Sequence, residues 1–271
     1  NDFEMLVNKF REAGINNVKI SAGYRLSYPD EKLFMFYLDE FETKLFDLPE
    51  GVYTCLIENE DCEEQILTPG MDDEIFSRTK VPMTKNEVRV LSISRLELTK
   101  KAVVYDVGSG TGSVSVECAR LSPDIAVFAI EQKEEAANLT KENAVRLGLS
   151  DQIMVINKKA PEGFEELPTP THVFIGGSSG ALSDILSAIQ KKLIVKENTK
   201  GVRVVINAVS LETIAQITKL IQTYPVKHVQ LTQIQASRAH KLGSYNLMQA
   251  QNPVLIASFN LLPDDKMEAD E

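Results

Sequence analysis

The first part of the chain mixes helical and extended patterns of apolar residues. In residues 2–13, apolar side chains recur at the spacing of one helical face, and Gly14 is expected to end this helix. The stretches 17–23 and 52–59 are rich in strand-forming residues and predict two strands. Between them, residues 26–41 combine turn signals with apolar residues and predict no single element.

A polar linker and a change of pattern follow. Residues 60–78 are acidic and polar, with a turn at Pro69-Gly70, and form the predicted linker. From Thr84 onward, apolar runs alternate with amphipathic segments, and Thr84-Lys-Asn-Glu87 fits a capping box that opens a helix. Apolar strands joined by helices indicate a parallel sheet covered on both faces. The predicted strands are 102–107, 125–131, 152–157, 172–177 and 202–209, and the predicted helices are 84–96, 113–121, 133–147, 181–193 and 211–224.

The end of the chain breaks this alternation. Residues 226–237 and 252–261 both have the pattern of strands, and the polar, basic segment 238–251 joins them without a helix. We therefore expect an α/β fold in which an antiparallel hairpin closes a parallel sheet. That seven-stranded arrangement is typical of class I S-adenosylmethionine (SAM) methyltransferases. The expected division of the chain is 1–67, 68–262 and a disordered acidic tail at 263–271.

Composition narrows the possible partners and cofactors. The 271 residues, 43% of them hydrophobic, can bury one large core or two modest ones. The net charge of −10 disfavours nucleic acid as a partner. No apolar run approaches the roughly 20 residues that span a membrane, and no leader pattern is present, so we expect a cytoplasmic protein. The three cysteines match no zinc spacing and the three histidines are dispersed, so no metal site is expected. Because the sequence starts at Asn1 within a helical pattern, we expect it to be a fragment.

The strongest local signal is the segment from Asp106 to Gly112, Asp-Val-Gly-Ser-Gly-Thr-Gly, where a buried strand turns into a helix. A nicotinamide fingerprint would need its third glycine at position 113, which is Ser113. Asp106 suits a ligand that carries an ammonium group, as SAM does, and would repel a pyrophosphate. Glu131 ends the next strand, where a carboxylate can accept both ribose hydroxyls; the alternative for Glu131 is a solvated acid. The loop therefore favours SAM over NAD.

Two later strand ends complete the expected cofactor region. Ala160-Pro161 follows the third strand and would flank an adenine, and Lys159 stands where many methyltransferases place an Asp that binds the adenine amino group. Gly176-Gly177 ends the fourth strand, where enzymes that methylate exocyclic amines carry an Asp/Asn-Pro-Pro-aromatic motif. This chain has no such motif, so methylation of a base nitrogen is less expected, and the small residues there leave room for a large flat substrate.

Several segments in order resemble one family. The chain is similar to the C-terminal half of the precorrin-6Y C5,15-methyltransferases (decarboxylating) of cobalamin biosynthesis over about residues 70–262. The segments that carry this resemblance are 80–89, 107–113, 160–162, 173–177, 207–213, 235–238 and 252–254. Residues 23–31 and 56–59 resemble the end of the companion tetrapyrrole methylase domain, and residues 67–73 resemble the junction. If so, the first half of the companion is missing, and we expect no methylation at C5.

The resemblance implies methylation of C15 of a precorrin with decarboxylation of the ring C acetate, a homotetramer built through the methyltransferase domain, and no catalytic triad or metal. No catalytic residue is assigned. Lys159, and His172 in place of an expected acid, depart from the family on what we expect to be the cofactor side. The expected cofactor-binding residues are Thr84, Asp106, Gly108, Ser109, Gly110, Thr111, Gly112, Glu131, Gln132, Ala160, Pro161 and Gly176.

The precorrin substrate carries many carboxylates, which arginine binds bidentately. The expected substrate-binding residues are Lys80, Lys85, Gly177, Arg238, His240 and Lys241, with Arg78 as a further candidate. For each charged residue the alternative is a solvated surface charge. The residues alone leave three alternative functions: a tRNA or isoaspartyl-protein methyltransferase, a SAM-sensing module without turnover, and an NAD-dependent oxidoreductase.

Overall fold

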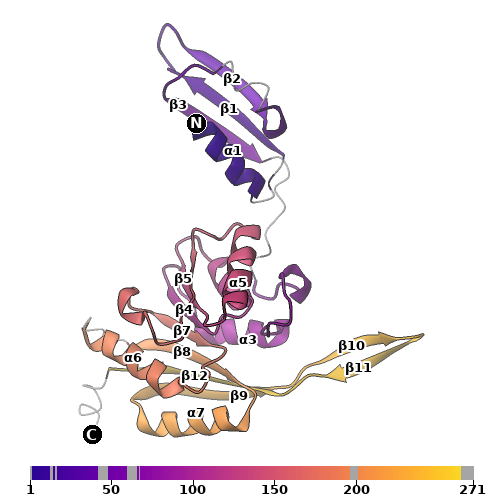
Figure 1. Cartoon of the computed structure of the whole chain (residues 1–271), viewed down its shortest axis with the longest axis vertical. Coiled ribbons are helices and arrows are strands. Elements are labelled where there is room, and N and C mark those ends of the chain that lie inside the picture. Colours follow the sequence, from indigo (N-terminus) through magenta and orange to yellow (C-terminus); the bar gives the residue numbers. More distant parts are fainter. Residues whose placement is uncertain are drawn as a thin grey trace. The chain divides into compact units, whose positions relative to one another are not determined.

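The computed structural model describes residues 2–12, 15, 17–41, 48–59, 66, 68–195 and 201–263. It divides into two units, Asn1–Ile66 and Leu67–Glu271 (Figure 1). The expected helix end at Gly14, the residue Cys62 and residues 264–271 of the tail predicted at 263–271 lie outside the described residues. No helix in the described part is both long and apolar enough to span a membrane.

The N-terminal unit is a three-stranded antiparallel sheet in the order β2-β1-β3, with one helix. Its elements are α1 (Asp2–Glu12), β1 (Val18–Tyr24), β2 (Lys32–Tyr37) and β3 (Tyr53–Asn59). Val7 of α1 packs on Val18, Ile20 and Phe36 in the core of this unit. Strand β2 comes from the segment that predicted no single element, because apolar side chains point to both of its faces.

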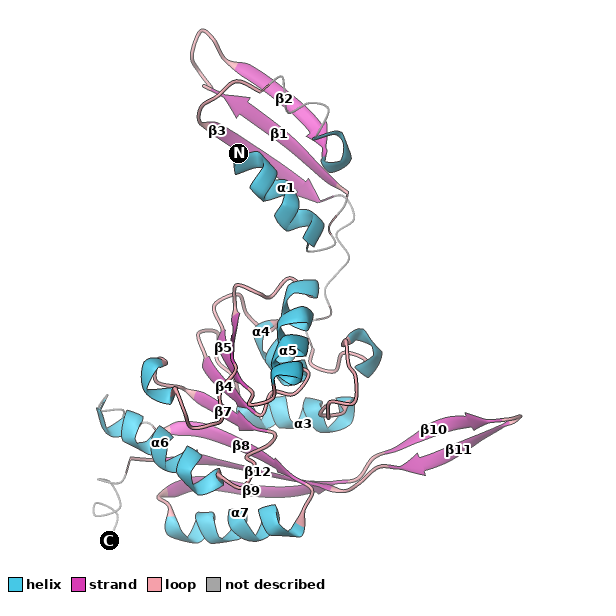
Figure 2. Ribbon diagram, in the orientation of Figure 1, coloured by secondary structure: helices cyan, strands magenta, loops and turns pink. Residues whose placement is uncertain are grey.

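The C-terminal unit contains a seven-stranded sheet in the order β6-β5-β4-β7-β8-β12-β9 (Figure 2). The five strands β4 to β8 are parallel, and β12 pairs antiparallel with β8 and β9. The predicted α/β fold with its terminal hairpin is therefore confirmed. The strands are β4 (Val103–Val107), β5 (Ala126–Ile130), β6 (Ile153–Ile156), β7 (His172–Ile175), β8 (Val202–Ala208), β9 (Val226–Ile234) and β12 (Val254–Leu261).

Helices cover both faces of this sheet because alternate strand residues are apolar on each side. One core contains Tyr105 and Val173 together with α6 and α7, and the other contains Val104 and Phe174 together with α3, α4 and α5. The connections change face between β4 and β7, and ligands of open α/β sheets bind at such a switch point. The helices are α3 (Asn86–Leu96), α4 (Ser113–Ala119), α5 (Glu134–Arg146), α6 (Leu182–Val195) and α7 (Leu211–Thr223).

Three glycines form the turn that leads β4 into α4. Gly108, Gly110 and Gly112 adopt φ values of 73°, 59° and 76°, which side chains disfavour. A Cβ atom on Gly108 would lie 2.6 Å from the carbonyl oxygen of Gly177, and one on Gly110 would lie 2.7 Å from that of Pro82. The loop thus passes directly against backbone from two other segments, which only glycine permits.

The predicted capping box at the start of α3 is wrong. The N-cap is Lys85, one residue later than the expected Thr84, and its side chain makes no capping hydrogen bond. Glu87 does not reach back to Thr84, because both of its carboxylate oxygens accept hydrogen bonds from the guanidinium of Arg238. A charged fork is a stronger partner for a carboxylate than a single backbone N–H.

The segment between the last two strands of the sheet forms an arm. Strands β10 (Ser237–Leu242) and β11 (Tyr245–Ala250) pair antiparallel around a two-residue turn. Their residues are exposed apart from the half-buried Arg238. Figure 2 shows this ribbon projecting from the edge of the sheet region. The expectation of two strands without a helix between them holds, but the arm itself was not predicted.

Candidate active site

A cavity of about 1000 Å³ lies at the carboxyl ends of the parallel strands of the C-terminal unit. It is lined by the glycine loop after β4, by Glu131 after β5, by Ala160 after β6 and by Gly176 and Gly177 after β7. These loops meet where the sheet connections change face, the expected place for a ligand in this kind of fold. The volume is at the upper end of the range for small-molecule sites.

Most of the residues expected around the cofactor line this cavity, and four of them do not. Those that line it are Thr84, Gly108, Ser109, Gly110, Glu131, Gln132, Ala160 and Gly176, together with Lys80, Lys85 and Gly177 from the expected substrate set. Those that do not are Asp106, Thr111, Gly112, Pro161, Arg78, Arg238, His240 and Lys241. Asp106 is buried within strand β4, Gly112 is the N-cap of helix α4, and Arg238, His240 and Lys241 belong to the arm, so these residues are kept from the cavity for different reasons.

Asp106 lies behind the glycine loop. Its side chain is 1% exposed, and its Oδ2 accepts a hydrogen bond of 2.5 Å from Ser115 Oγ. Burial raises the pKa of Asp106 to about 6, and the negative charge of Glu131 adds to the effect. Asp106 Oδ1 and Thr111 Oγ1 are buried and have no hydrogen-bond partner among the described residues. A buried polar atom without a partner is costly, so this loop fits a polar ligand.

Glu131 is held in place by the backbone. Its Oε2 accepts a hydrogen bond of 3.1 Å from the N–H of Gly110, and its Oε1 accepts one of 2.9 Å from the N–H of Lys133. A carboxylate offers about four acceptor positions, so each oxygen can accept another hydrogen bond. The fixed carboxylate beside the glycine loop therefore fits the paired hydroxyls of a ribose.

Lysines gather at this cavity although the chain is acidic overall. Lys80, Lys85, Lys133, Lys158 and Lys159 all line it. Lys133 and Lys158 were missed by the sequence analysis, although a Lys-Lys pair directly before Ala160 is a visible signal. Asn207, Val209, Gln251 and Asn252, which line the part of the cavity near β8 and β12, were also missed.

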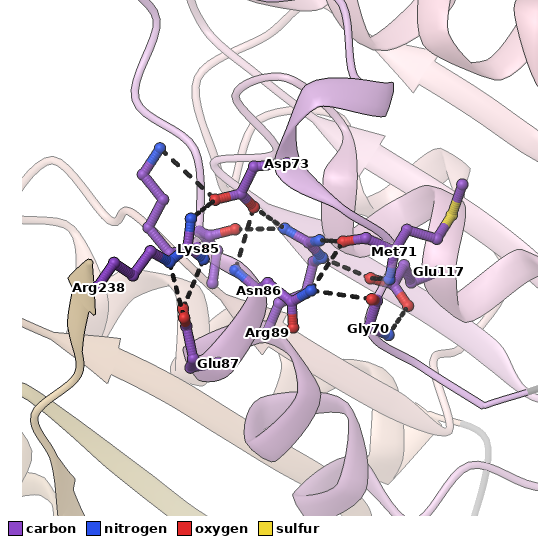
Figure 3. Close-up of polar contacts among 10 residues, drawn as sticks. Gly70, Met71, Asp73, Lys85, Asn86, Glu87, Arg89, Glu117 and Arg238 are labelled. Atoms are coloured by element: carbon purple, nitrogen blue, oxygen red, sulfur yellow. Dashed lines mark hydrogen bonds and ion pairs between the residues drawn. The ribbon is translucent and has the colours of Figure 1, made fainter. Parts of the chain in front are cut away.

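Arg238, His240 and Lys241 lie away from the cavity because β10 runs outward along the arm. Figure 3 shows the guanidinium of Arg238 directed at Glu87 and Asp73 instead. The expectation that His172 touches the cofactor side is wrong. It begins β7, at the opposite end of the strand from the cavity, where Thr171 Oγ1 lies 2.7 Å from its Nδ1.

The glycine loop, the strand-end carboxylate and the seven-stranded sheet with its reversed last strand define a SAM-dependent methyltransferase. SAM is the cofactor that this class uses, and the fixed carboxylate of Glu131 and the unpartnered polar atoms behind the loop fit it. The sequence model of the family described as the precorrin methyltransferase domain matches residues 74–260. The chain therefore belongs to the precorrin methyltransferase family.

Relatives and solved structures agree with this assignment. A Pyrobaculum calidifontis protein named as a probable cobalt-precorrin-6B C(15)-methyltransferase (decarboxylating) is 39% identical, over 70% of this chain and 94% of its own length. The crystal structure of precorrin-6y C5,15-methyltransferase from Geobacter metallireducens matches with a TM-score of 0.64 and 30% identity, over 71% of this chain and 96% of that one. A precorrin 8W decarboxylase from Methanobacterium thermoautotrophicum matches with the same TM-score and 31% identity, over 70% of this chain and all of that one.

Proposed function

We propose that this enzyme methylates C15 of a precorrin with decarboxylation of the ring C acetate, in cobalamin biosynthesis. The observation that carries the proposal is one continuous cavity of about 1000 Å³ with five lysines on its wall: Lys80, Lys85, Lys133, Lys158 and Lys159. Such a cavity suits a large substrate that bears several carboxylates. The names of the relatives support the same substrate class.

The sheet order divides the cavity into two halves. The glycine loop and Glu131 follow β4 and β5 and form the cofactor half. Asn207 and Val209 belong to the end of β8 and the loop after it, and Gln251 and Asn252 precede β12; they form the acceptor half. Gly177 lies between the halves, and a Cβ atom added there would meet nothing within 4 Å. This open space at the junction is where a flat acceptor can approach the cofactor.

Positioning can supply most of the rate in this reaction. SAM supplies an electrophilic methyl group, so the chain has to hold the acceptor carbon in line with it and exclude water. The lysines hold substrate carboxylates, and Glu131 holds the ribose. For the decarboxylation, the protein needs only to orient the acetate and leave it poorly solvated, because the conjugated macrocycle accepts the electron pair as carbon dioxide leaves.

The arm supports a further proposal, that the enzyme assembles with copies of itself. A two-stranded ribbon is marginal on its own in water, and this one exposes large apolar side chains: Leu242, Tyr245, Leu247 and Met248. We expect light scattering to show an oligomer, a tetramer by family resemblance. Replacing Tyr245 and Met248 with Ser should reduce the measured mass, and an unchanged mass would exclude the arm as the contact.

The N-terminal unit is proposed to derive from the tetrapyrrole methylase companion domain. The support is the resemblance of residues 23–31, which run from the end of β1 to the start of β2, and of residues 56–59, which lie in β3. We expect these 271 residues to leave C5 unmethylated. Incubation with SAM and a precorrin that lacks the C5 methyl tests this, because a second methyl in the product would contradict it.

The experiment that tests the main proposal is a mass-spectrometric turnover assay. The enzyme is incubated with SAM and a C5-methylated, C15-unmethylated precorrin, with and without cobalt. A product that gains one methyl and loses carbon dioxide supports the proposal. An unchanged precorrin, with methyl transfer to tRNA or protein instead, would overturn it. SAM binding without any product would favour a sensing module. The variant Glu131→Gln is the control for dependence on the cofactor half.

A further inference from the structure

The guanidinium of Arg238 joins the base of the arm to helix α3. Its Nε and Nη2 donate to the two carboxylate oxygens of Glu87 at 2.7 and 2.6 Å, and its Nη1 donates to Asp73 Oδ2 at 2.8 Å. This bidentate fork is the strongest geometry for such a pair. These hydrogen bonds lower the pKa of Glu87, so the carboxylate stays charged.

One partner of Arg238, Asp73, belongs to a buried network beside the cavity wall, whereas Glu87 is partly exposed. Asp73 is 2% exposed and also accepts hydrogen bonds of 3.1 Å from Arg89 and from the backbone of Asn86. Arg89 is fully buried, and it donates to Glu117 and to the carbonyl oxygen of Thr84 at 2.6 and 2.7 Å. Figure 3 shows these groups converging from different elements. The network therefore fixes the segment that precedes α3.

Both segments that meet at Arg238 continue into the cavity wall. On one side, the consecutive residues 80–85 line the cavity. On the other side, Arg238 pairs with Gln249 across the arm, and the N–H of Gln251 donates to the carbonyl oxygen of Ala236 at 2.9 Å. Gln251 and Asn252 line the acceptor half. Arg238 thus holds two walls of the cavity together without touching it.

We propose that Arg238 is a positioning residue that fixes the acceptor half of the cavity by clamping the base of the arm to Glu87 and Asp73. The expected effect on turnover of the precorrin rests on the proposed function, whereas the expected loosening of the cavity wall does not. Loss of the clamp leaves the glycine loop and Glu131 in place, because neither contacts Arg238. The larger effect therefore falls on the acceptor, and SAM is affected only through Thr84 and Pro82 of the segment 80–85, which face the cofactor half.

Hydrogen exchange tests the clamp without any turnover. In Arg238→Met, the backbone amides of Asn86 and Gln251, which donate to Asp73 and Ala236, are expected to exchange faster than in the wild type. The amide of Gly110, which donates to Glu131, is expected to keep its rate. Arg95→Met is the matched control, because Arg95 also joins α3 to the terminal hairpin region, through a hydrogen bond of 2.7 Å to Gln230, but lines no part of the cavity. Unchanged exchange at Asn86 and Gln251 would overturn the proposal.

Kinetics then separate positioning from simple loss of stability. In Arg238→Met, kcat/KM for the precorrin is expected to fall by roughly 100-fold, with the SAM dissociation constant within about twofold. Arg238→Lys should recover only part of the loss, because lysine cannot form the fork. Equal loss of SAM and precorrin affinity, or the same loss in Arg95→Met, would overturn the role. If the wild type does not turn over the precorrin, the proposed function fails, and the exchange rates still decide the clamp.

Discussion

Replacing Asp106 with Asn should change how the stability of the protein depends on pH. The side chain is 1% exposed, its Oδ2 accepts a hydrogen bond from Ser115, and its Oδ1 has no hydrogen-bond partner in the described part of the chain. Burial is the largest cause that raises the pKa of Asp106 from 3.8 to about 6. The ionised carboxylate is therefore disfavoured in the folded state relative to the unfolded chain, where it is hydrated.

The sign and size of the effect follow from this pKa. Because the folded protein holds the Asp106 proton more tightly than the unfolded chain, the associated stability is fully present below pH 3.8 and is lost as the pH rises through about 6. One pKa unit corresponds to roughly 1.4 kcal/mol, so the loss at neutral pH is about 3 kcal/mol. About 2 kcal/mol of it should appear between about pH 4.5 and pH 7.5.

Urea unfolding of the wild type and Asp106→Asn at several pH values measures this. The Asn amide adds a cost that does not depend on pH. The informative quantity is therefore the slope, against pH, of the difference between the unfolding free energies of the two proteins. The difference should shift in favour of the variant as the pH rises. Asp124→Asn, which removes an exposed carboxylate from the same unit, is the control. A difference for Asp106→Asn that stays constant within about 0.5 kcal/mol would refute the argument.

Three further predictions concern the core and the cavity. Arg89→Met should cost about 3–5 kcal/mol in urea unfolding, because it leaves the buried carboxylate of Glu117 without its cation; a cost under about 1 kcal/mol would show that the pair is dispensable. Gly108→Ala should lower the thermal midpoint, since its Cβ meets the carbonyl of Gly177, whereas Gly177→Leu should keep the midpoint and abolish turnover by filling the cavity. Glu131→Gln should weaken SAM binding in calorimetry by roughly 1.5–3 kcal/mol, the worth of a hydrogen bond to a charged group, and unchanged affinity would remove Glu131 from the ribose site.

The sheet and the cofactor half were predictable because their signals are local. Parallel strands are apolar on both faces, and the glycine loop and Glu131 follow directly from strand ends. The arm was not predicted, because a ribbon exposed on both faces needs no apolar alternation. The signal that could have found it is the Gly243-Ser244 pair between Leu242 and Tyr245, a two-residue hairpin turn with glycine first.

The role of a cation depends on where its nearest carboxylate lies, and that is a property of the fold. Arg238 was expected to bind a substrate carboxylate, yet its partners Glu87 and Asp73 are 151 and 165 residues away in the sequence. No spacing rule connects them. Lys133 and Lys159 have the reverse placement, on the cavity wall beside the cofactor half. With the proposed precorrin as acceptor, Arg238, whose partners lie within the chain, fixes the cavity, and lysines such as Lys133 and Lys159 recognise the carboxylates that enter it.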